Sequence, residues 1–129
     1  MNDSQLVDIA RAARRKAYAP YSDFAVGAAL LTRSGKVFTG VNVENASYGL
    51  SMCAERSAVF AAVAAGETEF EAIAVVTKNG GSPCGACRQV LSEFGLDTRV
   101  IIADVMGNQT NWTVRDLLPN SFGPQHLKT

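Results

Sequence analysis

The sequence predicts one α/β domain spanning residues 1–129, with helices packed on a mixed β-sheet. The chain has 129 residues, of which 47% are apolar and 19% charged, enough for one core and too few for two domains. Helix and strand patterns also alternate in the order helix, hairpin, helix, strand, helix, strand. This order implies right-handed crossovers between the later strands.

The first part of the chain predicts a helix followed by a hairpin. Asp3 or Ser4 can cap the helix, and Pro20 stops it. Residues 24–31 then predict a strand of small residues, and residues 37–43 predict its partner after a turn. The apolar positions of the helix fall near one stripe, formed by Leu6, Ile9, Ala13 and Ala17.

A second helix and an apolar strand are predicted next. Residues 53–65 are rich in alanine and contain no Gly or Pro, so we expect a buried helix closed by Gly66. Residues 72–77 have the pattern of a short apolar strand, and residues 79–83 that of a turn.

The last third of the chain predicts a helix, a strand and a short helix. Gly95 ends the first of these helices, residues 99–103 form the strand, and Thr113 caps the last helix with Asp116 as its capping-box partner. That helix runs through Leu118, and an irregular tail follows to Thr129. The first helix keeps one face, formed by Cys84, Cys87, Leu91 and Phe94.

The charge balance argues against a nucleic-acid or anionic-membrane partner. The 12 basic and 12 acidic residues cancel, so no strongly electropositive face is expected. No apolar run has the length of a membrane span, and residues 1–6 are polar, unlike a signal peptide. We therefore expect a soluble, cytoplasmic protein.

Three cysteines lie in two motifs that predict a metal site. Cys53 opens Cys-Ala-Glu-Arg, whereas Cys84 and Cys87 belong to Pro-Cys-Gly-Ala-Cys-Arg-Gln. Residues three apart at a helix start share a face, so these two can hold one ion, with Cys53 arriving from the neighbouring helix. Three ligands leave one corner of a tetrahedral zinc open, as in catalytic sites. The single histidine, His126, lies in the tail, where we expect it to be solvated.

Two charged neighbours of Cys53 are candidates for the chemistry. Glu55 stands two residues from a ligand, where it can face the water site without binding the metal. We interpret it as a proton shuttle rather than a first-turn glutamate favoured by the helix dipole. Arg56 either offsets the negative charge of the thiolates or is a surface cation, and the residues alone leave both readings open.

These motifs resemble the short, homotetrameric class of zinc-dependent cytidine deaminases. Cys-Ala-Glu followed by Pro-Cys-Gly-Ala-Cys-Arg-Gln matches the all-cysteine form of the zinc deaminase signature. One departure is visible, the loop from Lys78 to Ser82, which is shorter than in many members and carries no motif residue. The likeness extends over almost the whole chain, through Tyr-Ala-Pro-Tyr-Ser at 18–22, Phe24 with Val-Gly-Ala-Ala at 26–29, Asn-Val-Glu-Asn-Ala-Ser-Tyr at 42–48, and Leu-Leu-Pro at 117–119 with Phe122.

The resemblance implies a three-layer α/β/α fold with a mixed five-stranded sheet, one Zn²⁺ per chain and a homotetramer with shared active sites. It implies hydrolysis of cytidine, and of 2′-deoxycytidine, to uridine or deoxyuridine and ammonia, with Glu55 shuttling protons, and it favours a charge-tuning role for Arg56. The implied substrate contacts are Asn42 and Glu44 to the ribose, Phe24 beside sugar and base, Ala54 at the pyrimidine edge, Ala46 and Tyr48 near the 5′-hydroxyl in a neighbouring subunit's pocket, and Phe122 on the base from another subunit.

Other functions remain open at this point. A deaminase of another cytosine compound, such as the blasticidin type, shares the cysteine motifs, although Glu44 and Tyr48 favour a nucleoside sugar. A thiol-disulfide oxidoreductase would use Cys84 and Cys87 but leaves Cys-Ala-Glu unexplained. A structural zinc module would need a fourth ligand. A nucleotide substrate is disfavoured, since no Gly-rich phosphate loop or basic cluster lies beside the motifs.

Overall fold

The computed structural model describes residues 1–127 of the chain. The irregular tail expected to reach Thr129 is therefore described only as far as Leu127, and residues 128–129 lie outside the described part. The helices are α1 (Asp3–Arg14), α2 (Ala54–Ala64), α3 (Gly85–Glu93) and α4 (Val114–Leu117). The strands are β1 (Gly27–Thr32), β2 (Val37–Val41), β3 (Phe70–Thr77), β4 (Arg99–Asp104) and β5 (Gln109–Thr113).

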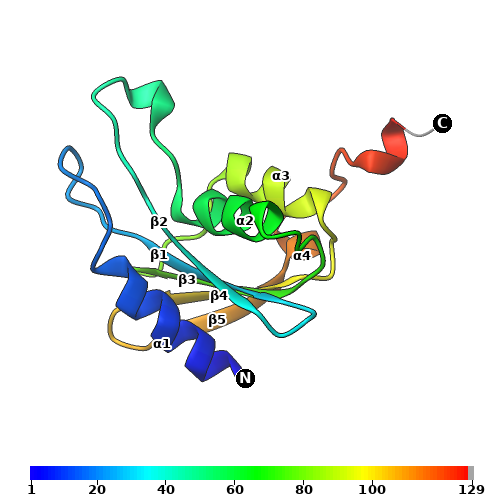
Figure 1. Cartoon of the computed structure of the whole chain (residues 1–129), viewed down its shortest axis with the longest axis horizontal. Helices are drawn as coiled ribbons and strands as arrows, with labels where there is room; N and C mark the ends of the chain where they lie inside the picture. Colours follow the sequence, from blue (N-terminus) through cyan, green and yellow to red (C-terminus); the bar gives the residue numbers. More distant parts are fainter. Residues whose placement is uncertain (128–129) are drawn as a thin grey trace.

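The strands form a five-stranded mixed sheet between two helical layers. Their order is β2-β1-β3-β4-β5, with β3 and β4 parallel and every other neighbouring pair antiparallel. Helix α1 covers one face of the sheet, and α2 and α3 lie side by side over the other (Figure 1). The expected three-layer α/β/α fold is confirmed. Across residues 1–127, no helix has both the length and the apolar character needed to cross a membrane.

The core consists of one apolar cluster on each face of the sheet. Strand β3 contributes to both, because successive side chains of a strand point to opposite faces. Its Ile73 and Val75 pack beneath α2 and α3, whereas Ala72, Ala74 and Val76 pack beneath α1. Burial on both faces explains why this strand is a continuous apolar run in the sequence.

Gly40 sets how closely α2 approaches the sheet. A side-chain carbon at this position on β2 would lie 2.2 Å from the Ala54 carbonyl oxygen and 2.5 Å from the Ala58 nitrogen. Both atoms belong to the helix backbone, so only glycine allows this contact without moving the helix. The first turn of α2, which follows Cys53, is therefore held against the sheet edge.

The first helix and the first strand are shorter than the sequence predicts. Asn2, not Asp3 or Ser4, caps α1, because its side chain and that of Gln5 exchange hydrogen bonds with each other's backbone at 2.9 Å. The helix ends at Arg14, so the predicted stripe position Ala17 lies beyond it. Strand β1 begins at Gly27 rather than Phe24, because the Asn42 side chain takes the Val26 N–H and the Phe24 carbonyl in place of a regular strand ladder.

The strand β5 is absent from the element order predicted by periodicity. All its side chains are exposed or half-buried, and its sequence Gln-Thr-Asn-Trp-Thr has no apolar alternation. It pairs along β4 at the sheet edge, from Arg99 opposite Thr113 to Ala103 opposite Gln109. Backbone pairing alone defines this strand, so only the family resemblance predicts a fifth strand.

Candidate metal centre and active site

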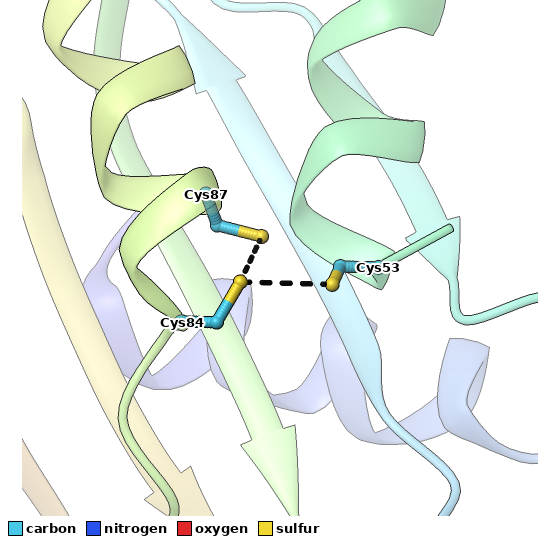
Figure 2. Close-up of side chains that lie close together, drawn as sticks. All are labelled: Cys53, Cys84 and Cys87. Carbon is cyan, nitrogen blue, oxygen red and sulfur yellow. Dashed lines mark hydrogen bonds between the residues drawn. The ribbon is translucent and has the colours of Figure 1, made fainter. Parts of the chain in front are cut away.

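The three cysteines meet at the N-termini of two neighbouring helices. Cys53 is the N-cap of α2 and Cys84 the N-cap of α3, with Cys87 in the first turn of α3. The Sγ atoms of Cys53 and Cys84 are 3.8 Å apart, and those of Cys84 and Cys87 are 3.4 Å apart (Figure 2). Helix N-termini carry partial positive charge, which favours thiolates at these positions.

This donor set fits a zinc ion. With Zn–S bonds of about 2.3 Å, the sulfurs of a tetrahedral site lie about 3.8 Å apart. The three Sγ atoms all lie within 4.8 Å of one another, and no other acidic, cysteine or histidine cluster of this kind is found in residues 1–127. His126 does not join the cluster: its Nδ1 accepts a hydrogen bond from the Gly123 N–H at 3.0 Å. Three ligands leave a fourth position open.

The surroundings of the cluster favour a thiolate at Cys53. Its pKa is lowered to about 5, first by a hydrogen bond from the Cys87 thiol and then by the Arg56 guanidinium, whose Nη2 lies 3.3 Å from the Cys53 sulfur. The same interaction with Cys53, together with burial, raises the pKa of Cys87. A bound cation would take the place of the proton that these thiols share. The half-buried Arg56 therefore contacts one of the clustered cysteines directly.

Glu55 is a buried carboxyl beside the cysteines. Only 5% of the residue is exposed, and burial is the main cause that raises its pKa. The negative charge on Cys53 acts in the same direction. A raised pKa means that the carboxyl holds a proton more readily, which suits a group that must accept and release protons during hydrolysis.

The cysteine cluster opens into a cavity of about 360 Å³. This volume lies within the range of small-molecule sites. None of the lining residues identified in the described chain is Lys or Arg. They include predicted site residues from separate segments, namely Phe24, Asn42, Glu44, Cys53, Ala54, Glu55 and Cys84, together with Ser22, Val26, Ser51, Met52, Val75, Thr77, Gly81 and Ser82.

Asn42 and Glu44 hold the wall of the cavity through hydrogen bonds. Asn42 Oδ1 accepts from the Val26 N–H and its Nδ2 donates to the Phe24 carbonyl, both at 2.8 Å. Glu44 accepts from the backbone of Tyr21 and from the backbone and hydroxyl of Ser22. These bonds fix both side chains, and they leave Asn42 one acceptor and one donor position and Glu44 one acceptor position for a ligand.

Three predicted contact residues do not line the cysteine-containing cavity of their own chain, although Tyr48 lines an adjoining hollow that shares Ser22, Glu44 and Ser51 with it. Ala46, Tyr48 and Phe122 are exposed and are not among its lining residues in the described structure. Tyr48 packs edge-on against Tyr21, with the ring centres 6.1 Å apart. Phe122 stacks on His126 in the C-terminal segment, which extends away from the sheet (Figure 1). The structure therefore brings together the three cysteines, Glu55 and the residues on one cavity wall, with Tyr48 beside this wall and Ala46 and Phe122 not among the lining residues.

Comparison with known proteins identifies the family. A family model described as the cytidine and deoxycytidylate deaminase zinc-binding region matches residues 1–103. The chain belongs to this deaminase family. A cytidine deaminase from Halalkalibacterium halodurans is 50% identical, over 98% of this chain and 98% of that protein. A probable cytidine deaminase from Dictyostelium discoideum is 44% identical, over 98% of this chain and 90% of that protein.

A solved structure of a cytidine deaminase shares the fold of this chain. The crystal structure of cytidine deaminase from Burkholderia pseudomallei has a TM-score of 0.91 and 54% identity, and the match covers 95% of this chain and 100% of that one. Membership makes the chain a hydrolytic deaminase with zinc as its cofactor, and its cysteine cluster fits that ion. The oxidoreductase and structural-module readings are thereby set aside.

Arg88 is a structural part of the deaminase site that sequence reasoning missed. It donates to the Pro83 carbonyl, the Leu117 carbonyl and the Ser82 hydroxyl, each at 2.8 Å. These bonds tie the loop before Cys84 to the C-terminal end of α4. The motif Pro-Cys-Gly-Ala-Cys-Arg-Gln places an arginine here, but its partner Leu117 is distant in sequence and gives no local signal.

Proposed function

We propose that the protein hydrolyses cytidine, and also 2′-deoxycytidine, to the corresponding uracil nucleoside and ammonia. The observation that carries this proposal is the buried Glu55 carboxyl in the same cavity as the Cys53 and Cys84 sulfurs. Such a site combines metal ligands with a group able to move protons. With three reduced cysteines, the cytoplasm is the compartment that suits it, since thiols persist there.

Glu55 carries the proton transfers of the proposed reaction. A zinc ion held by the three thiolates would supply Lewis-acid chemistry that acidifies a water molecule. Glu55 takes one proton from the attacking water and delivers it to ring N3 as the oxygen adds to C4. It then passes the second proton of that water to the departing amine. Water and cytidine are consumed, and uridine and ammonia are formed, so all atoms balance.

Arg56 and Ala54 support this chemistry from the first turn of α2. The Arg56 guanidinium offsets part of the negative charge of three thiolates and the nearby carboxylate. Ala54 is buried and lines the cavity beside Glu55. Its backbone N–H belongs to the first turn of a helix, where such groups lack an intrahelical partner. We assign it to the pyrimidine edge.

The cavity favours a nucleoside over a nucleotide. It is lined by Glu44 and Glu55, while none of the lining residues identified within 1–127 carries a positive charge. A phosphate would therefore enter an uncompensated negative site, whereas ribose hydroxyls can donate to Glu44 and approach Asn42. Phe24, at the same wall, offers an apolar surface beside sugar and base.

The substrate is tested by following the ultraviolet absorbance change of deamination with cytidine and with cytidine 5′-monophosphate. We expect cytidine turnover and a kcat/KM at least about a hundredfold lower for the monophosphate, because like charges repel in a partly desolvated site. 2′-Deoxycytidine serves as a matched neutral substrate. Equal kcat/KM for cytidine and its monophosphate would show that the charge of the cavity does not exclude a nucleotide.

We also propose a homotetramer in which subunits complete one another's active sites. Two observations support it: Phe122 and Tyr48 are exposed aromatic residues, and neither lines the cavity of its own chain. Large exposed aromatic side chains are typical of surfaces that meet a partner. Phe122 then stacks on the base bound in another subunit, and Ala46 and Tyr48 reach a neighbour's pocket near the 5′-hydroxyl.

Shared sites predict complementation between Phe122→Ala and Glu55→Ala chains. Base stacking contributes about 1 to 3 kcal/mol, so Phe122→Ala alone should be clearly impaired, and Glu55→Ala alone nearly inactive. Co-expression with random, equal mixing should place an intact Glu55 opposite an intact Phe122 in about a quarter of sites. Activity per zinc should then exceed the average of the separate mutants. A purified mixed oligomer showing only that average would defeat the shared-site assignment.

A further inference from the structure

The Ser22 hydroxyl connects two residues of the cavity wall, Phe24 and Glu44. It accepts a hydrogen bond from the Phe24 backbone N–H at 3.0 Å and donates its own hydrogen to Glu44 Oε2. Ser22 itself lines the cavity that contains the cysteine cluster. Because a hydroxyl has a single hydrogen to donate, this arrangement commits it to the carboxylate.

The turn that carries Ser22 has an uncommon backbone conformation. Asp23 has φ of 56°, in the left-handed region that residues other than glycine rarely occupy. The Asp23 N–H bonds back to the Ala19 carbonyl at 3.0 Å, so the chain reverses at this point. Strained backbone of this kind persists where the surrounding contacts over-determine it, and it clusters at ligand sites. The Ser22 hydroxyl is one of those contacts, since it accepts a hydrogen bond from the N–H of Phe24, the residue after Asp23.

The same turn holds both oxygens of Glu44. Oε1 accepts from the Tyr21 N–H at 2.9 Å and the Ser22 N–H at 3.1 Å, while Oε2 accepts from the Ser22 hydroxyl. These bonds, with the Ser22 hydroxyl first, lower the pKa of Glu44. An ionised carboxylate only accepts hydrogen bonds, and Oε2 retains a second acceptor position. The side chain is therefore pre-oriented for a hydroxyl donor in the cavity.

We infer that Ser22 is a positioning residue for sugar recognition, whose hydroxyl fixes the Glu44 carboxylate and the Phe24 backbone in the geometry that receives the ribose hydroxyls. The inference rests on the proposed function and deepens it by naming a residue that sets affinity for the sugar. Without the Ser22 hydroxyl, Oε1 would stay held by the Tyr21 and Ser22 N–H groups, but Oε2 would lose its partner. The carboxylate would then have to give up more freedom on binding, which weakens affinity.

Ser22→Ala tests this role through the affinity of two competing ligands. With uridine as a competitive inhibitor of cytidine turnover, we expect its inhibition constant to rise about tenfold, because the variant lacks a charge-assisted hydrogen bond that orients Glu44 for binding. The kcat for cytidine should change by less than about twofold, since this bond acts on ground-state binding. The inhibition constant of 2′,3′-dideoxyuridine, which lacks both ring hydroxyls, should stay within about twofold of wild type. Zinc content and thermal unfolding report whether the fold is intact.

Ser22→Thr is the matched control, because it keeps the hydroxyl and should hold the uridine inhibition constant near the wild-type value. In a chain that already carries Glu44→Gln, adding Ser22→Ala should raise the uridine inhibition constant little further, as expected for coupled residues. If the binding of uridine and of 2′,3′-dideoxyuridine weakened equally, Ser22 would only stabilise the turn and the inference would be wrong. Unchanged uridine binding would overturn the inference outright. Failure of the proposed function looks different, since the wild-type chain would then not deaminate cytidine.

Discussion

The Glu55→Gln variant is expected to keep one zinc per chain and to lose about 10²- to 10⁴-fold in kcat. Glutamine preserves the size of the side chain but cannot exchange a proton at neutral pH. Glu55 is buried and its pKa is raised mainly by that burial, so removing its charge should not destabilise the chain. The measurement is steady-state deamination of cytidine together with zinc analysis of the same sample.

Glu55→Asp provides the matched control, because it keeps the carboxyl and withdraws it by one methylene. Its rate should fall between those of wild type and Glu55→Gln if carboxyl placement limits proton transfer. Near-normal turnover by Glu55→Gln, with zinc fully retained, would show that another group moves the protons.

The Cys84→Ala variant is expected to lose both zinc and activity. Cys84 is the central sulfur of the cluster, 3.8 Å from that of Cys53 and 3.4 Å from that of Cys87. Two remaining thiolates cannot complete the site, and loss of a ligand from a three-ligand zinc site leaves insufficient affinity. The residue is exposed in the chain, so its loss should affect the core little. Zinc per chain and kcat should both fall by more than about tenfold.

Arg56→Gln is the control for this loss of metal. It removes the guanidinium contact to the Cys53 sulfur without removing any of the three ligand atoms. It should therefore retain zinc while lowering the rate or shifting its pH dependence, because the site becomes more negative. Full zinc content in Cys84→Ala would contradict the ligand assignment, and unchanged kinetics of Arg56→Gln across pH would return Arg56 to a structural role.

The sequence predicts those features that depend on neighbouring residues. The capping box of Thr113 and Asp116 is present with both of its hydrogen bonds, and Gly66 follows α2 with φ of 87°. The two cysteine motifs are predicted to open helices, and both do so. In each case a few adjacent side chains determine the local backbone, so the signal is contained in the local sequence.

Features that depend on distant partners could not be predicted. Residues 24–26 are apolar enough to resemble a strand, but the Phe24 carbonyl and the Val26 N–H pair with the side chain of Asn42. Strand β5 is defined by pairing with β4 and has no apolar pattern of its own. Ser22 stands in a polar turn, where nothing local indicates that its hydroxyl meets Glu44. The Asn42 and Ser22 contacts join segments far apart in the sequence, and β5 depends on backbone pairing, so periodicity detects none of them.

The most direct measurement is ammonia release from cytidine as zinc is removed from the wild-type chain by a chelator and then restored. The three-cysteine cluster and the buried Glu55 predict activity proportional to zinc content up to one ion per chain, with recovery when zinc is added back. A metal-free chain that released ammonia at the full rate, or a zinc-loaded chain that released none, would contradict the account.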